Sequence, residues 1–201
     1  MAQKTNYSEL NQYHLGIWYS AYRLLISTGL LLIFLLTYPE LTGDYQYPQL
    51  YYYALGIGVA INTAQLFALK WIRRLIQPQL IMIFFSDVCV LSLLTLASDG
   101  PNLQIGLLFV ITIFSASLLL DAKKALVVTL IAVISVIYQH FIGSIFAFSS
   151  LSNISNSALL AFLFFVVYGT GQIAVRRFQI LENLNFSQSL ELHRLQNINR
   201  Y

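Results

Sequence analysis

The chain has 201 residues, of which 58% are hydrophobic and only 9% are charged, and its formal net charge is +3. Soluble globular proteins carry roughly 25% charged residues, so this composition excludes a soluble globular domain and indicates a membrane protein. The basic residues lie in short clusters between apolar segments, which argues against nucleic acid as a partner.

Six apolar segments follow one another along the chain, and each approaches the roughly 20 helical residues that cross a hydrocarbon core of about 30 Å. The polar residues 1–15 precede the first segment, and no small-residue cleavage site follows it, so we interpret it as a retained anchor. The predicted fold class is therefore all-α, a polytopic membrane protein with six transmembrane helices inside residues 16–177. These helices are expected over residues 16–37, 49–69, 79–97, 103–120, 125–146 and 157–175.

The distribution of Lys and Arg predicts the orientation of these helices. Basic residues occupy alternate connections, and the remaining connections contain neither Lys nor Arg. Cytoplasmic loops carry the excess of basic residues, so both termini of this multi-pass protein are expected in the cytoplasm, and in a bacterium it would lie in the inner membrane. Trp18, Tyr19 and Tyr22 are expected to mark the cytoplasmic boundary of the first helix. The basic residues concerned are Lys4, Lys70, Arg73, Arg74, Lys123, Lys124, Arg176 and Arg177.

The last segment, residues 178–201, is polar and helix-forming. Leu and Ile residues at both of its ends fit a coiled-coil seam, but the intervening heptad would place Gln188 and Glu191 inside. No helix stop signal precedes Tyr201. The segment is therefore predicted to be a cytoplasmic linker helix that leads to a further cytoplasmic part.

Three polar residues are expected deep in the membrane. At 1.5 Å per residue, Asp87 lies about 12 Å inside the cytoplasmic boundary, and Arg23 and Asn62 lie about 10 Å inside it. Ionisable residues at such depths are rare and usually functional, so we hypothesise that the three form a buried polar sensing cluster. In the alternative, Arg23 extends to the headgroups and Asp87 is a neutral, hydrogen-bonded packing residue.

Gln139 and His140 in the fifth segment are secondary polar candidates. No Cys, Glu or second His accompanies them, so no metal site is expected. No phosphate-binding loop, carboxylate pair or nucleophile motif is present in the sequence, and we expect no catalytic site in this chain.

Small residues suggest where helices approach one another. Ala54 and Gly58, four residues apart, are typical of close helix contact or dimerisation. Gly169 and Gly171 could loosen the sixth helix just before the cytoplasmic segment, and tight packing explains them equally well.

Short motifs along the chain resemble the N-terminal membrane region of PilS-type sensor histidine kinases, which regulate type IV pilus genes. The resemblance extends over nearly the whole chain. The motifs are Tyr19-Ser20-Ala21-Tyr22-Arg23-Leu24-Leu25, Ser86-Asp87-Val88, Ala97-Ser98-Asp99-Gly100, Gly106-Leu107-Leu108, Ala174-Val175-Arg176-Arg177 and Leu195-Gln196-Asn197-Ile198-Asn199-Arg200-Tyr201.

This resemblance implies a homodimeric sensor in a two-component system. In that family a cytoplasmic part outside this chain autophosphorylates on His with ATP and Mg²⁺ and passes the phosphoryl group to a response regulator. The resemblance also implies that the stimulus is a membrane partner, such as the transmembrane helix of pilin held in the lipid bilayer.

Two other functions are compatible with the composition. A small transporter would use the polar layer to line a substrate path, although the two halves show no inverted repeat and few intramembrane polar residues. A membrane scaffold would use the helices only to hold a complex together. The cytoplasmic linker helix favours signal output over a plain anchor.

Overall fold

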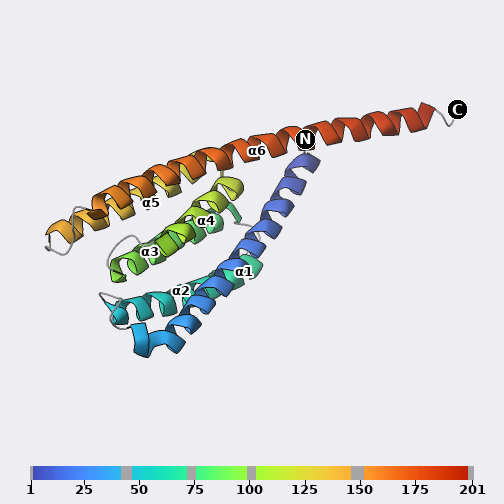
Figure 1. Cartoon of the computed structure of the whole chain (residues 1–201). Helices are drawn as coiled ribbons and strands as arrows, with labels where there is room; N and C mark the ends of the chain where they lie inside the picture. The colour runs from blue at the N-terminus through green and yellow to red at the C-terminus, as the bar shows by residue number, and fades with distance from the viewer. Residues whose placement is uncertain (1, 42–46, 72–75, 99–102, 146–151, 199–201) are drawn as a thin grey trace.

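The computed structural model describes residues 2–41, 47–71, 76–98, 103–145 and 152–198. These residues form an all-helical bundle, which confirms the predicted all-α class (Figure 1). The six helices are α1 (Ala2–Leu41), α2 (Pro48–Trp71), α3 (Ile76–Ala97), α4 (Leu103–Leu119), α5 (Ala122–Ile145) and α6 (Ser152–Ile198).

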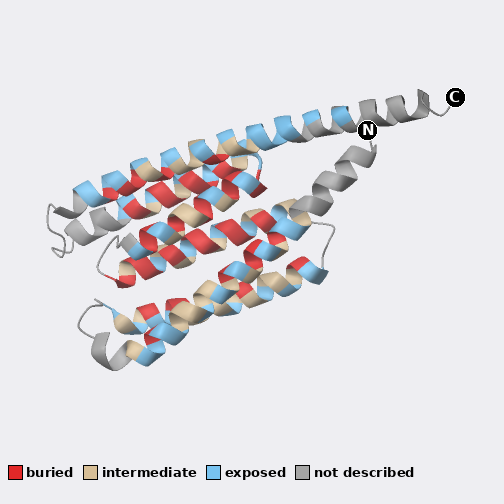
Figure 2. Ribbon diagram, turned by 45° about the vertical axis from the view of Figure 1, so that its right-hand side comes forward, coloured by how far each residue is buried: buried red, intermediate tan, exposed pale blue. Residues whose placement is uncertain are grey.

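Helix α3 lies at the centre of the bundle and joins two groups of helices. On one side α1 packs against α2, and α2 packs against α3; on the other side α4, α5 and α6 pack against one another and α3 contacts α4 and α5. Helix α1 also reaches α3 and α4, over smaller contacts. Buried residues line the facing sides of these helices (Figure 2). The core of the protein is therefore built on α3.

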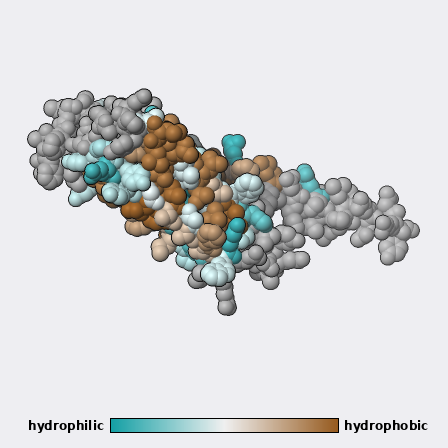
Figure 3. Space-filling model, turned by 90° about the horizontal axis from the view of Figure 1, so that it is seen from below, coloured by the Kyte–Doolittle hydropathy of each residue, from teal (hydrophilic) through white to brown (hydrophobic). Residues whose placement is uncertain are grey.

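Four described helical segments are long and apolar enough to cross a bilayer, and a shorter apolar helix covers Gln104–Leu119. Large apolar side chains are exposed along them, for example Leu36 at 73% and Phe67 at 64%. Figure 3 shows apolar side chains gathered over the middle of one face of the molecule. Such a surface suits lipid contact, so the protein is a multi-pass membrane protein. The four long segments are Tyr13–Thr37, Pro48–Trp71, Ile76–Ala97 and Ser155–Leu181.

The first and last helices extend beyond the predicted transmembrane segments. Helix α1 begins at Ala2 rather than Gly16, and α6 continues through residue 177 to Ile198. Neither extension contains Pro or Gly, the residues that most often end a helix. The predicted linker is thus a continuation of the last transmembrane helix. It projects away from the bundle on the side where α1 starts (Figure 1).

Small residues allow α2 to approach α3 closely. A Cβ atom at Gly58 would lie 3.1 Å from Cγ1 of Val90, and Ala54, one turn away, is 2% exposed. The predicted close contact is therefore made within the bundle at Gly58, between α2 and α3, and Ala54 is buried as well.

Candidate functional site

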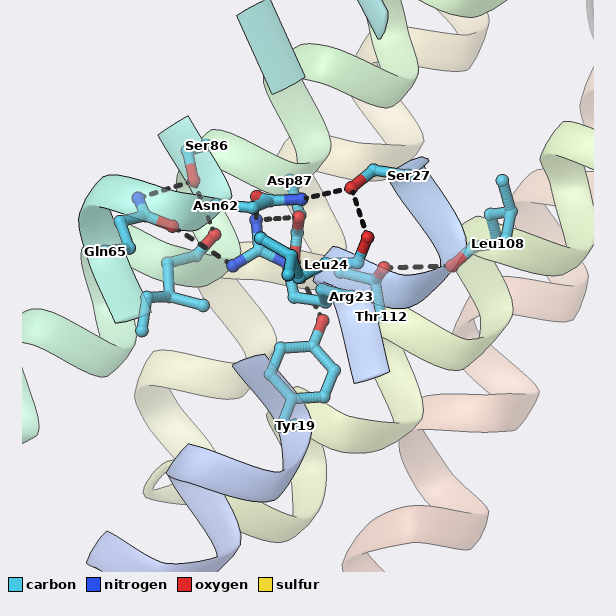
Figure 4. Close-up of polar contacts among 11 residues, drawn as sticks. Tyr19, Arg23, Leu24, Ser27, Asn62, Gln65, Ser86, Asp87, Leu108 and Thr112 are labelled. Atoms are coloured by element: carbon cyan, nitrogen blue, oxygen red, sulfur yellow. Dashed lines mark hydrogen bonds and ion pairs between the residues drawn. The ribbon is translucent and has the colours of Figure 1, made fainter. Parts of the chain in front are cut away.

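Three adjacent helices each contribute one polar residue to a buried cluster. The Arg23 guanidinium of α1 forms an ion pair with the Asp87 carboxylate of α3 through Nη2 (Figure 4). The same Nη2 donates a hydrogen bond of 2.7 Å to Oδ1 of Asn62 on α2. Arg23, Asn62 and Asp87 are 7%, 6% and 9% exposed. The structure thus brings together the three residues that the sequence predicted to share one layer.

Tyr19 adds a fourth member to this cluster. Its hydroxyl donates a hydrogen bond of 2.8 Å to Oδ2 of Asp87, and the Arg23 Cζ atom lies 5.7 Å from the centre of its ring. The Tyr19 side chain is buried between helices and takes part in the cluster, a role that the sequence did not predict, whereas the neighbouring Trp18 is 74% exposed. Tyr19 precedes Arg23 by four residues, so both side chains lie on the inward face of α1.

Three uncharged polar residues extend the cluster into a network. Arg23 Nη1 donates to Oε1 of Gln65 at 3.1 Å, and Gln65 Nε2 donates to Oγ of Ser86 at 2.9 Å. Asn62 Nδ2 donates to Oγ of Ser27 at 3.1 Å. The predicted cluster did not include these residues, although the spacing of two of them along their helices indicates that they belong to it. Gln65 follows Asn62 by three residues and Ser27 follows Arg23 by four, and helical neighbours at these spacings share a face.

The network balances its charges but does not use every donor. Arg23 and Asp87 carry opposite charges, as a membrane interior requires of buried ionisable groups. Among the residues that the structure describes, Nε of Arg23 and Oγ of Ser20 have no hydrogen-bond partner. A buried donor without an acceptor is unfavourable, so the cluster retains a small energetic cost at Arg23.

A cavity of about 70 Å³ lies beside the network, between α1, α2, α3 and α4. Arg23, Asn62, Asp87 and Thr112 are among the residues that line it, one from each helix. These four residues form the polar end of the cavity. The opposite end lies about one or two helical turns away from them and is apolar. It is lined by Leu30, Leu55, Leu94 and Leu108.

The other predicted polar candidates do not join this site in the described residues. Gln139 and His140 belong to α5, but their side chains lie outside the described residues. Across the described segments, no group of three or more His, Cys, Asp or Glu residues is placed to hold a metal ion.

Helix α6 packs closely against α4 at Gly171. A Cβ atom at Gly171 would lie 2.6 Å from Cβ of Ser117, whereas a Cβ atom at Gly169 would have nothing within 4 Å. Two hydrogen bonds flank this contact: Gln172 Nε2 donates to the Ser117 carbonyl at 3.5 Å, and the Tyr168 hydroxyl donates to the Ala122 carbonyl at 3.1 Å. Tight packing therefore explains Gly171 better than a loosened helix does.

A family model described as a PilS-like transmembrane domain matches residues 5–184. The matched region contains all six helices in whole or in part, the polar network and the cavity. No curated protein and no solved structure matches the chain.

Proposed function

Because the chain belongs to the family of PilS-like transmembrane domains, we propose that it is the sensory input domain of a two-component sensor histidine kinase. In this proposal Asp87, Arg23 and Asn62 form the sensing site. The stimulus is a membrane partner such as the transmembrane helix of pilin, and the response is altered expression of type IV pilus genes. The single observation that carries the proposal is the buried Arg23–Asp87 ion pair beside a cavity, within the membrane-spanning part of the bundle.

The proposed output passes through α6 to a cytoplasmic kinase. We expect that part of the protein to bind ATP and Mg²⁺, to act as a homodimer and to transfer a phosphoryl group to a response regulator. The uninterrupted course of α6 from the bundle to Ile198 supports this route, since a continuous helix can carry a rotation or a shift along its length.

Helix α4 provides a physical connection between the proposed sensing site and α6. Leu108, Ile111 and Thr112 of α4 line the cavity, and Ser117, further along the same helix, packs against Gly171. Packed interfaces tend to switch between discrete arrangements rather than deform continuously. A change in the position of α4 at the cavity would therefore be felt at α6, with a coupling energy of about 1–3 kcal/mol if it resembles other coupled sites.

We also propose that the chain spans the membrane six times with both termini in the cytoplasm. This topology predicts that single cysteines, introduced after Cys89→Ser, react with a membrane-impermeant thiol reagent in an alternating pattern. Asp44→Cys, Asp99→Cys and Ser150→Cys should react in intact spheroplasts, and Lys70→Cys, Lys123→Cys and Arg177→Cys only after the cells are opened. Two consecutive connections labelled from the same side would contradict six spans.

The sensor function predicts that the full-length protein, in membranes, incorporates phosphate from ATP on a histidine. Asp87→Asn keeps the shape of the side chain but removes its charge, so it should change the rate of phosphorylation by about 5-fold or more, the lower range of allosteric couplings. The control is Asp121→Asn, the same chemical change at an exposed carboxylate whose partner is Lys124. Asp121→Asn should leave the rate of phosphorylation within about twofold of the wild-type rate.

Two outcomes would count against the sensor. Absence of phosphorylation would favour the alternative functions, a small transporter or a membrane scaffold. Equal rates for Asp87→Asn and the wild type would leave a kinase whose input lies elsewhere in the protein.

A further inference from the structure

Three exposed basic residues of α5 and α6 lie at the end of the bundle from which α6 projects (Figure 1). At this end Gln172 of α6 donates a hydrogen bond to the carbonyl of Ser117, which lies in the last turn of α4. Arg176 and Arg177 follow Gln172 by about one turn, or roughly 6–8 Å along α6. Lys123 lies in the first turn of α5, just after the connection from α4. The end of the α5–α6 pair therefore carries three exposed positive charges.

The directions of the two helices bring these charges to a similar level. The Cα–Cβ bonds of an α-helix tilt toward its N-terminus. Helix α6 starts at the opposite end of the bundle, where Leu160 packs against Gly106 in the first turn of α4. Arg176 and Arg177 therefore lean back toward the bundle. Helix α5 starts at the charged end, so Lys123 leans away from the bundle. The three side chains thus converge on the layer next to the hydrocarbon core, where lipid headgroups lie.

The protein does not neutralise these three charges within the part of the chain that the structure describes. Lys123, Arg176 and Arg177 have no ion-pair partner there. The acidic residue nearest to them in the described sequence, Asp121, already binds Lys124 at 2.8 Å. An anion from outside the protein would therefore find positive charge that is not yet balanced.

Apolar side chains lie one helical turn deeper on the same faces. Ile173 precedes the two arginines by three and four residues and is 57% exposed. Leu126 and Val127 follow Lys123 by three and four residues and are 37% and 53% exposed. Helical residues at these spacings share a face. A ligand that combines an anionic head with apolar chains would fit this arrangement, whereas a free phosphate ion would leave the apolar part unused.

Phospholipids with a net negative charge have this chemistry. Arginine binds phosphate through paired hydrogen bonds, and lysine binds it as a point charge. A zwitterionic headgroup carries its own ammonium group and would leave the protein charges unbalanced. We propose that Lys123, Arg176 and Arg177 form a binding site for an anionic phospholipid, whose acyl chains run along Ile173 and Val127.

This inference goes beyond the proposed sensing of a membrane partner, since it concerns a lipid and requires no kinase. The bound headgroup would hold α6 at the point where it leaves the bundle. The depth of α6 in the membrane would then depend on the lipid composition.

The test measures which lipid contacts α6. The full chain is reconstituted in phosphatidylcholine vesicles that contain a minor fraction of acyl-brominated phosphatidylglycerol or acyl-brominated phosphatidylcholine, and quenching of a single tryptophan is recorded. The exposed Trp18 and Trp71 are first replaced by Phe, and Ile173→Trp then provides the reporter beside the site. Leu159→Trp, 64% exposed near the other end of α6, is the matched control reporter.

We expect the Ile173→Trp reporter to prefer phosphatidylglycerol over phosphatidylcholine by about fivefold or more, since one basic residue near an anionic lipid surface contributes about that factor. The Leu159→Trp reporter should show a ratio near one. Combined Lys123→Gln, Arg176→Gln and Arg177→Gln should bring the Ile173→Trp ratio close to one, and these exposed positions should tolerate the changes. Lys70→Gln on α2, which also removes one exposed positive charge, should leave that ratio unchanged.

Four results would overturn the proposal. A ratio near one at Ile173→Trp would mean that the basic residues select no lipid. Equal preference at both reporters, or a loss caused by Lys70→Gln, would mean that the net charge of the protein attracts the lipid without a site. A ratio that survives the triple replacement would place the site at other residues. Loss of the preference on addition of millimolar inorganic phosphate would identify a site for a free anion instead of a lipid.

Discussion

Replacing Asp87 by alanine is expected to lower the free energy of unfolding by about 3–5 kcal/mol, since it leaves the Arg23 charge buried and unpaired. Both residues are buried, and Tyr19 would lose its acceptor at the same time. The measurement is reversible unfolding of the purified protein in mixed micelles, followed by the loss of helical signal as denaturing detergent is added.

A double-mutant cycle with Arg23→Ala tests whether this cost comes from the pair. The double variant should be less destabilised than the sum of the two single variants by about 1–3 kcal/mol, because removing both charges leaves neither one unpaired. Asp121→Ala provides the control. Its carboxylate binds Lys124 at 2.8 Å but is 65% exposed, and such surface pairs contribute about 1 kcal/mol or less. Additive single effects at Arg23 and Asp87 would show that the pair does not form in the micelle-bound protein.

Replacing Gly171 by alanine is expected to cost about 1–3 kcal/mol through overpacking, because its new Cβ atom would lie 2.6 Å from Cβ of Ser117. Gly169→Ala is the matched control, two residues earlier on the same helix. It has open space around the added methyl group and should be neutral or stabilising by up to about 1 kcal/mol, the difference in helix propensity. Both variants are measured in the same micelle assay.

The contact itself can be tested by moving the Cβ atom from α4 to α6. Ser117→Gly combined with Gly171→Ala removes the atom that the alanine meets, so most of the lost stability should return, apart from the cost of glycine within α4. Equal destabilisation by Gly169→Ala and Gly171→Ala would mean that α6 does not pack on α4 at this point.

The sequence alone was sufficient to predict the number of helices and the polar layer. The bilayer thickness and the rise per residue constrain any membrane helix, so counting residues from each boundary placed Arg23, Asn62 and Asp87 at similar depths. The structure joins these three by hydrogen bonds and an ion pair. Tyr19, Gln65 and Ser27 had the right spacing to be added, but spacing along one helix does not show which face is buried.

Helix packing could not be predicted in the same way, because lipid and protein interior are equally apolar. Phe84 and Phe85 are adjacent and identical in chemistry, yet Phe84 is 0% exposed and Phe85 is 48% exposed. Gly169 and Gly171 likewise differ only in what stands opposite them. In a soluble helix the polar residues would have marked the outer face, but here most of both faces is apolar.

The pairing of Arg23 with Asp87 also has a consequence for how these two charges experience the membrane potential. A single charge that moves through the full membrane field gains about 2.3 kcal/mol per 100 mV. Because the two opposite charges are in contact, a joint movement of both transfers almost no net charge across the membrane. A movement that carries this pair as a unit would therefore depend very little on the membrane potential, whereas a movement that separates the two charges would depend on it.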